Sequence, residues 1–215
     1  MNAPGLFLVL EGPEGSGKST LAGALAQRMR GVGVEPVVVR EPGGTRAGEI
    51  ARQALLDPEN PIGAVSELFF YLAARADLVH RVIRPALAAG QVVVSDRFTL
   101  STEAYQMAGR GLPPEVVLPA NRAAADGLHP DLTLILDLPP DVGQARQVAA
   151  GKHLDRLDRE GAEFHRRVIA HYLAVQADGV RHLDGLLLPD RLLHAAWAEV
   201  LTAAPTKFGA HQRSR

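Results

Sequence analysis

One short stretch of the chain has the residues and spacing needed to hold phosphate groups. Gly12 is followed by four residues and then by Gly17, Lys18 and Ser19, which matches the pattern G-x-x-x-x-G-K-[ST]. Glycines allow the backbone to turn several N–H groups toward one anion, the start of a helix adds a positive partial charge, and Lys18 adds a full one. The stretch therefore predicts a cradle for nucleotide phosphates, with Lys18 as a catalytic residue and Ser19 as a ligand of Mg²⁺. The expected phosphate-binding residues are Gly12, Pro13, Glu14, Gly15, Ser16, Gly17, Lys18, Ser19 and Thr20.

The alternative is a glycine-rich turn between a strand and a helix that binds nothing. The context favours the cradle, because the loop follows the apolar run from Leu6 to Leu10 and precedes a helical pattern from Lys18 to Arg30. Such a cradle does not identify the second substrate, since GTPases, motor ATPases and small-molecule kinases share it. Other residues must distinguish these classes.

A polar stripe follows the apolar run that ends in VVVSDR. Arg97, Ser101 and Tyr105 are each four residues apart, so a helix would present them along one face. Arg97 would also lie at the carboxyl end of a strand, where open α/β sheets bind their ligands. We therefore expect a ligand contact, although a solvated helix face is the alternative. Asp96 is suitably placed to hold Mg²⁺ through water, with a helix N-cap as its alternative role.

Two further arginines accompany groups that can grip a flat, charged ligand. Tyr71 and Arg75 are four residues apart in a helical segment, and an aromatic ring with a guanidinium can stack on a base and bind its edge. The run Phe69, Phe70, Tyr71 could equally belong to the core. Arg40 begins REPGGT at the end of another apolar run, and we expect it to be a second contact for an anion rather than part of a plain loop.

The composition limits the classes of protein to which the chain can belong. It has 215 residues, 47% of them hydrophobic, which suffices for one domain with its own core. Cysteine is absent, which excludes disulfides and thiolate zinc sites and suits a reducing cytoplasm. The net charge is −1 with acids and bases interspersed, so we do not expect nucleic acid as a partner. No apolar run approaches the ~18 residues of a membrane span, so we do not expect a membrane as a partner either. The eight histidines lack the spacing of metal ligands.

Short β-branched runs alternate with longer helical segments, which predicts an α/β protein with a parallel sheet. The expected strands are Leu6 to Leu10, Val34 to Val39, Gln91 to Ser95, Leu132 to Leu138 and Val180 to Leu183. The expected helices are Lys18 to Arg30, Arg46 to Leu56, Val65 to Ala89, Phe98 to Met107, Pro114 to Ala125, Asp141 to Ala150, Glu160 to Ala177 and Asp190 to Leu201. We assign residues 1–205 to a single domain and expect the polar, basic tail 206–215 to be disordered.

Together these motifs resemble those of bacterial thymidylate kinases, which belong to the P-loop nucleoside monophosphate kinases. The resemblance extends to about Glu160 and is carried by EGPEGSGKST, REPGGT, YLAARADLV, SDRFTLSTEAYQ, GRG, PDLTLILDL and LDRLDRE. It implies a three-layer fold with a five-stranded parallel sheet in the order 2-3-1-4-5, a mobile lid, Mg²⁺ with ATP as phosphoryl donor, and a homodimer. The implied acceptor is thymidine 5′-monophosphate (dTMP), bound by Glu14, Arg40, Tyr71, Arg75, Arg97, Ser101, Thr102, Tyr105 and Gln106.

The same resemblance implies a role for most of these contacts. Arg40 and Arg97 hold the acceptor phosphate, and Tyr71 stacks on thymine. Glu14 faces the 3′-hydroxyl of the sugar, and Tyr105 excludes a 2′-hydroxyl. The edge of the base is addressed by Arg75, Ser101 and Gln106.

The segment from Arg146 to Arg159 resembles the lid that closes over ATP in this family. Many bacterial members carry several arginines there, because their P-loop has an acid followed by glycine instead of a basic residue. This chain departs from that pattern, with Val148 and Ala150 where relatives often have arginine. We predict Arg146 as the catalytic arginine of the lid, with Arg156 as the second candidate; a solvated loop is the alternative.

The expected reaction is phosphoryl transfer from ATP to dTMP. A phosphate monoester, with a second pKa of about 6, is already anionic at neutral pH and needs no general base. Two alternatives remain open at the level of sequence. A kinase for another acceptor, such as a deoxynucleoside, would need a carboxylate base, for which Glu14 or Glu41 is available. A P-loop switch or ATP-binding module would perform no acceptor chemistry.

Overall fold

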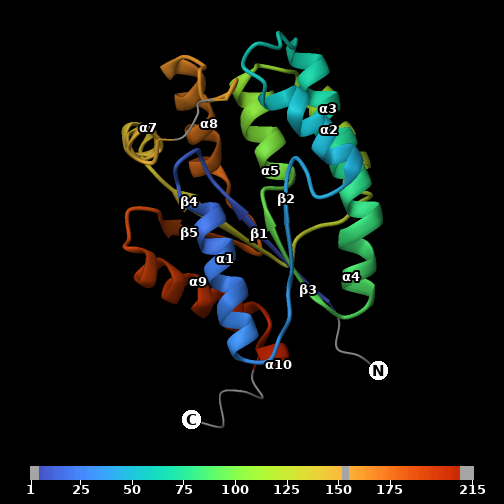
Figure 1. Ribbon diagram of the computed structural model, residues 1–215, viewed down its shortest axis with the longest axis vertical. Helices are drawn as coiled ribbons and strands as arrows, with labels where there is room; N and C mark the ends of the chain where they lie inside the picture. The colour runs from blue at the N-terminus through green and yellow to red at the C-terminus, as the bar shows by residue number, and fades with distance from the viewer. Residues whose placement is uncertain (1–4, 152–154, 209–215) are drawn as a thin grey trace.

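The computed structural model describes residues 5–151 and 155–208, in which five parallel strands form one sheet. The strands are β1 (Leu6–Glu11), β2 (Val37–Arg40), β3 (Val92–Asp96), β4 (Leu132–Asp137) and β5 (Val180–Asp184). Their order is β2-β3-β1-β4-β5, so the predicted α/β fold with this strand order is confirmed (Figure 1). Strand β2 begins later than predicted, at Val37, because Pro36 has no N–H to contribute to the sheet.

Helices connect the strands. They are α1 (Lys18–Gly31), α2 (Arg46–Leu56), α3 (Ala64–Leu78), α4 (Arg84–Ala88), α5 (Thr99–Thr102), α6 (Pro114–Ala124), α7 (Pro140–Ala149), α8 (Ala162–Ala174), α9 (Pro189–Ala203) and α10 (Pro205–Phe208). Two π-helical turns, η1 (Val79–Ile83) and η2 (Glu103–Gly109), continue α3 and α5. Within the described ranges, no helix is both long enough and apolar enough to cross a membrane.

The π-helical turns divide two segments that the sequence pattern predicts as single helices. The segment from Val65 to Ala89 consists of α3, η1 and α4. Pro85 lies in the first turn of α4 and has no N–H, so a regular α-helical hydrogen bond is impossible there, and the turn before it is wider. The segment from Phe98 to Met107 likewise consists of α5 and η2.

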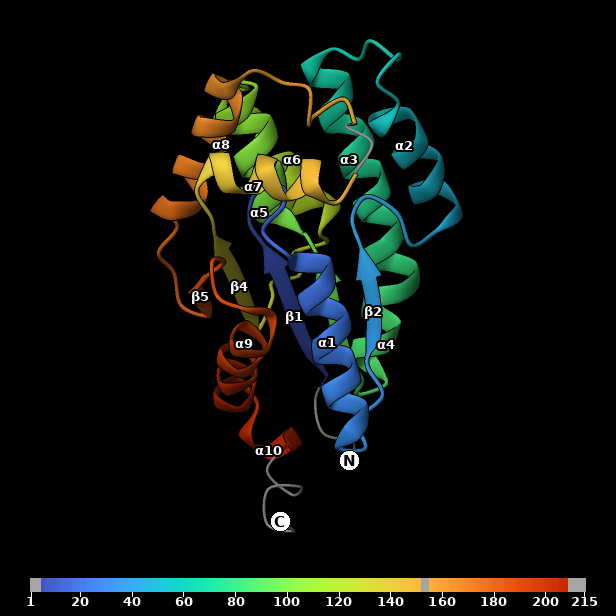
Figure 2. The same ribbon diagram turned by 60° about the vertical axis from the view of Figure 1, so that its left-hand side comes forward.

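The central strand β1 supplies two cores, because its side chains alternate between the two faces of the sheet. All six of its residues are buried. Leu8 packs with Leu25 of α1 in one core, whereas Phe7 packs with Ile83 of η1 in the other. Helices therefore cover both faces. The carboxyl ends of the strands meet at one edge, where the loop after β1 and helices α3, α5 and α7 gather (Figure 2).

The structure corrects the expectation that the tail is disordered from residue 206. Pro205–Phe208 forms α10, and Phe208 is only 1% exposed. Its ring packs edge to face on Trp197 of α9, with 5.2 Å between ring centroids. Lys207 donates a hydrogen bond to the carbonyl oxygen of Gly90 at 2.9 Å. Phe208 therefore anchors this helix as a single apolar residue among polar ones. Residues 209–215 of the predicted tail lie outside the described part of the chain.

The substitution Phe208→Ala should lower the free energy of unfolding by about 3 kcal/mol, because it removes a buried ring and leaves a cavity against Trp197. Urea titration followed by circular dichroism measures this loss. Ile50→Ala, at a position 59% exposed on α2, is the matched control and should change stability by less than about 0.5 kcal/mol. Equal effects for the two variants would show that Phe208 is not part of the core.

Candidate functional site

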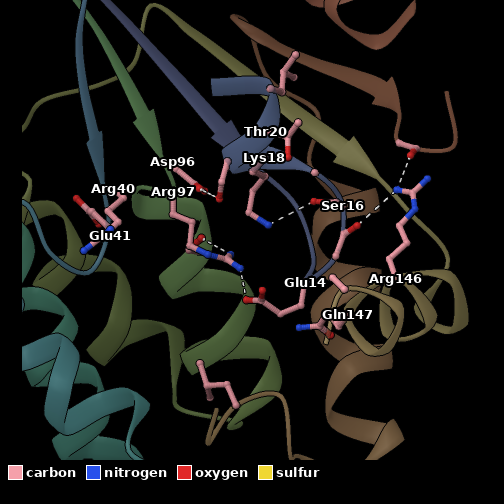
Figure 3. A pocket seen from close by; sticks show the side chains of 18 of the residues that line it. Glu14, Ser16, Lys18, Thr20, Arg40, Glu41, Asp96, Arg97, Arg146 and Gln147 are labelled. Atoms are coloured by element: carbon pink, nitrogen blue, oxygen red, sulfur yellow. Dashed lines mark hydrogen bonds and ion pairs between the residues drawn. The ribbon is translucent and has the colours of Figure 1, made fainter. Parts of the chain in front are cut away.

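A cavity of about 820 Å³ opens at the edge where the strands end (Figure 3). It runs from the loop after β1 toward α3 and α5 on one side and toward the loop between β5 and α9 on the other. Most predicted site residues line it: Glu14, Gly15, Ser16, Gly17, Lys18, Ser19, Thr20, Arg40, Tyr71, Asp96, Arg97, Ser101, Thr102, Tyr105, Gln106 and Arg146. The predicted residues outside its lining are Gly12, Pro13, Arg75 and Arg156. The structure thus brings most of the residues predicted to bind ATP phosphates and most of those predicted to bind dTMP into one cavity.

The phosphate-binding loop has a backbone that only glycine adopts readily. Gly12, Gly15 and Gly17 have φ angles of 134°, 73° and 96°. A Cβ atom at Gly15 would lie 2.3 Å from the carbonyl oxygen of Gly143 in α7, so a larger residue would push that helix away. Lys18 begins α1, and its ammonium donates to the carbonyl oxygen of Gly12 at 3.0 Å. The ammonium therefore lies across the loop, in a position to meet phosphate oxygens.

Arg97 places its guanidinium beside this loop. Its φ of 77° is unusual for a residue with a Cβ atom, and its backbone N–H donates to the carbonyl oxygen of Leu10 at 2.9 Å. The guanidinium forms an ion pair with Glu14 (Figure 3). It also donates to the hydroxyl oxygens of Ser101 at 3.1 Å and Tyr105 at 3.3 Å. The predicted polar stripe therefore converges on the arginine that begins it.

Glu11, at the end of β1, was not among the predicted site residues; it does not line the cavity, but it holds Ser101, which does. Its carboxylate is fully buried and accepts hydrogen bonds from the backbone N–H groups of Phe98 at 2.8 Å and Ser101 at 3.1 Å. The hydroxyl groups of Ser101 and Tyr172 donate to its other oxygen. Burial raises the pKa of Glu11, although these hydrogen bonds and the charge of Arg97 act in the opposite direction. An acid that ends an otherwise apolar strand was the available signal.

The side of the cavity beyond Arg97 carries more positive charge than predicted. Arg40, the last residue of β2, donates to Glu49 at 3.1 Å. Arg52 of α2 was not predicted, yet it lines the same cavity and donates to the carbonyl oxygen of Pro42 at 3.0 Å. The REPGGT turn folds α2 back toward the site, and sequence periodicity does not specify the direction of such a turn.

Arg75 lies behind the cavity wall instead of in it. Its side chain is 1% exposed and forms an ion pair with Glu41 at 2.7 Å. It donates to the carbonyl oxygen of Phe98 at 2.9 Å and to Oγ1 of Thr102 at 3.0 Å. The four-residue spacing from Tyr71 therefore did not place both side chains at the cavity. Thr102, which lines the cavity, separates Arg75 from it.

Ser19 and Asp96 bring two oxygen ligands together next to the phosphate-binding loop. The hydroxyl of Ser19 donates to the carboxylate of Asp96, and both residues line the cavity. Hydroxyl and carboxylate oxygens suit Mg²⁺, which in nucleotide sites takes few protein ligands and completes its shell with phosphate oxygens and water. Within the described residues, no group of three or more acids, histidines or cysteines is placed to hold a metal without such help.

The opposite end of the cavity is apolar, and the sequence analysis left it unassigned. It is lined by Leu186, Leu187, Leu188, Pro189 and Leu192. Leu186 and Leu188 are 52% and 70% exposed, so the loop presents two large apolar side chains at this end of the cavity. Such a surface suits the flat face of a nucleotide base.

Comparison with other proteins gives a match over most of the length of the chain. A family model described as thymidylate kinase matches residues 10–183. The chain belongs to the thymidylate kinase family. It is 52% identical to a thymidylate kinase of Ectopseudomonas mendocina over 176 residues, which cover 80% of this chain and 83% of that protein. A thymidylate kinase of a Synechococcus species is 51% identical, with 80% and 81% covered, and one of Pseudomonas putida is 45% identical, with 94% and 95% covered. The resemblance inferred from the motifs is thus confirmed.

The two lid arginines of this thymidylate kinase family member occupy different surroundings. Arg146 of α7 lines the cavity and donates to the carbonyl oxygens of Gly185 at 2.9 Å and Gly15 at 3.4 Å. Arg156 points elsewhere and forms an ion pair with Glu67 at 2.6 Å. The geometry therefore favours Arg146 of the two predicted candidates. Residues 152–154 of the predicted lid lie outside the described part of the chain.

Lys18 is a buried cation next to another cation. Burial lowers the pKa of Lys18 from 10.5 to about 8, and the charge of Arg97 acts in the same direction. Glu14, Asp96 and Glu11 partly offset both effects. Lys18 therefore loses its proton within an experimentally accessible pH range when no nucleotide is bound.

The value of kcat/KM for ATP should accordingly fall as the pH rises, with an apparent pKa near 8, because this ratio reports groups of the free protein. Steady-state kinetics over pH 7 to about 10 measure the profile. The turnover number at saturating ATP should decline only at higher pH, since bound phosphates stabilise the ammonium. A level kcat/KM profile across this range would contradict the role of Lys18.

Proposed function

We propose that the chain transfers a phosphoryl group from ATP to dTMP, giving ADP and thymidine 5′-diphosphate. The position of Arg97 carries the proposal: its guanidinium lies beside the phosphate-binding loop and shares one cavity with Lys18 and Tyr71. Two nucleotides bound with their phosphates at Lys18 and Arg97 would meet phosphate to phosphate, with their bases toward opposite ends of the cavity. We also assign the reaction to the cytoplasm, whose reducing conditions suit a chain without cysteine.

Phosphoryl transfer depends on in-line positioning and on cations around the spreading negative charge. Lys18 meets the outer phosphates of ATP, and Arg97 meets the acceptor phosphate. Arg40 and Arg52 line the acceptor side of the cavity and supplement Arg97. Because an oxygen of the acceptor phosphate is the nucleophile, no side chain has to remove a proton from it.

Side chains around Arg97 select the acceptor nucleoside. Tyr71 stacks on thymine, and Gln106 addresses the edge of the base. Glu14 faces the 3′-hydroxyl, and Tyr105, which contacts Arg97, is the residue we assign to the exclusion of a 2′-hydroxyl. Ser101 and Thr102 line the same wall, and Arg75 acts on the base only through Thr102.

Mg²⁺ fits the remaining oxygen ligands of the site. Ser19 and Asp96 would hold it against the phosphates of ATP, where it neutralises negative charge. Arg146 is the lid residue assigned to the transferred phosphoryl group, because it borders the cavity from α7. The apolar loop between β5 and α9 receives the adenine.

Both alternatives to this reaction have less support. A kinase for a hydroxyl acceptor needs a carboxylate base, but Glu14 is in an ion pair with Arg97 and Glu41 is in one with Arg75. A P-loop switch without acceptor chemistry has no use for a second group of arginines opposite the phosphate-binding loop.

A coupled assay that detects ADP formation, run across nucleosides and nucleoside monophosphates, tests the proposed reaction. We expect dTMP to be the best acceptor, with thymidine inactive because it lacks the phosphate that Arg97 binds. ATP hydrolysis stimulated by nucleic acid, without turnover of any monophosphate, would support a switch instead.

The same panel with Arg97→Ala supplies the control. Turnover of dTMP should fall by about 10² to 10³, the usual effect of removing one preorganised charge. Near-normal turnover and KM for dTMP in this variant would exclude the role assigned to Arg97.

We further propose that the protein is a homodimer, as the family resemblance implies. An exposed apolar stripe on α3, formed by Val65, Phe69 and Phe70, lies next to exposed Val116 and Leu118 of α6. Helices α3 and α6 pack on each other through Leu68 and Val117, so these side chains belong to adjoining surfaces. A second copy of the chain is the occupant that would remove this area from water.

Phe69→Glu should shift the protein from dimer to monomer, because a charge would then be buried at the centre of the apolar stripe. Sedimentation velocity at micromolar concentration measures the change. Leu173→Glu, at a position 52% exposed on α8, is the matched control and should leave the dimer intact. A wild-type protein that sediments as a monomer would contradict the proposal.

A further inference from the structure

Glu67 is a buried carboxylate to which the proposed reaction gives no role. It lies on α3 with none of its surface exposed. Arg110, directly after η2, pairs with it at 2.9 Å, and Arg156 pairs with it at 2.6 Å. The side-chain amide of Gln106 donates to it from Nε2 at 2.8 Å. All three partners are donors, so the carboxylate acts only as an acceptor.

The surroundings of Glu67 keep it ionised. Burial alone would raise the pKa of Glu67, but hydrogen bonds from Arg110 and Gln106 and the charge of Arg156 outweigh burial and hold it below its ordinary value. An ionised carboxylate cannot donate a hydrogen bond.

This charge determines which way the amide of Gln106 faces. The amide has a donating nitrogen and an accepting oxygen, and only the nitrogen can face an ionised carboxylate. The oxygen is therefore the group that Gln106 has left for the cavity, which it lines together with Tyr71. Reversing the amide would place two oxygens against each other.

We propose that Glu67 is a positioning residue that selects the acceptor base by holding the amide oxygen of Gln106 toward it; the inference rests on the function proposed above. Thymine and uracil carry an N–H group at ring position 3, which an amide oxygen accepts. Cytosine has a bare nitrogen there, which would face that oxygen without a proton between them. Glu67 therefore favours pyrimidines with a 4-carbonyl group over those with a 4-amino group.

The hydroxyl of Thr102, on the same wall of the cavity, favours the same bases as a hydrogen-bond donor. Oγ1 of Thr102 accepts a hydrogen bond from Nη1 of Arg75, whose other partners include Glu41. The hydroxyl of Thr102 therefore has its proton left to donate. A 4-carbonyl group accepts such a proton, whereas a 4-amino group does not.

The test compares kcat/KM for dTMP, dUMP and dCMP in the wild type and in Glu67→Gln. In the wild type, dTMP should exceed dCMP by about 10⁴, as in other sites that pair with a polar group of the substrate. Glutamine at this position both donates and accepts, so the amide of Gln106 is free to reverse. The dTMP:dCMP ratio should then fall by at least about 30-fold, with dUMP following dTMP.

Glu163→Gln is the matched control, because Glu163 is 65% exposed on α8 and pairs only with arginines of its own helix among the residues described. Its dTMP:dCMP ratio should equal that of the wild type. An unchanged ratio in a folded Glu67→Gln variant would overturn the inference. A wild type without dTMP turnover would instead reject the proposed function.

Gln106→Met keeps the test decisive if Glu67→Gln does not fold. Methionine preserves the volume of glutamine and leaves Glu67 paired with both arginines, but it removes the amide oxygen. The dTMP:dCMP ratio should collapse mainly through loss of dTMP turnover. A ratio that stays near the wild-type value would show that the amide does not read the base.

Discussion

The site depends on holding two cations side by side in a buried position. Lys18 and Arg97 come from separate elements, and each would be unstable there without negative partners. Glu14 pairs with Arg97, while Glu11 and Asp96 add charge nearby. The carboxylates thus hold the cations before any phosphate arrives. As a result, the donor and acceptor sides form one electrostatic unit, and a change on one side is felt on the other.

Much of the fold could be predicted because its signals are local. The runs of β1, β3 and β4 are apolar and β-branched, and the glycines of the phosphate-binding loop mark the exact passage from strand to helix. What could not be predicted depends on tertiary contacts. Phe208 belongs by composition to a polar tail, and its burial becomes evident only with Trp197 beside it. By contrast, η1 has a local signal in Pro85, which helical periodicity alone does not take into account.

In the candidate site, too, some residues could be predicted from local spacing, whereas others depend on tertiary contacts. Arg97, Ser101 and Tyr105 share a helical spacing, and the structure brings them together. Arg52 and Glu67 lie outside the motifs and Glu11 begins one, but the surroundings of all three depend on contacts that spacing does not reveal. Arg75 illustrates the opposite error, because its spacing from Tyr71 is helical but its guanidinium turns inward to Glu41. Spacing identifies candidates for one helix face, whereas the burial of each candidate is decided by neighbouring elements.

The order of the strands has a consequence for how the chain acquires its native form. Strand β1 is made first, yet its neighbours in the sheet are β3 and β4, so Leu8 pairs with both Val94 and Leu132. The walls that fix the loop after β1 therefore assemble only once distant parts of the chain have joined, and such long-range closure is slow. A nucleotide that requires this loop in its final shape stabilises completed molecules and leaves partly assembled ones unaided. Nucleotide binding is thereby coupled to completion of the whole sheet and not to the folding of this loop alone.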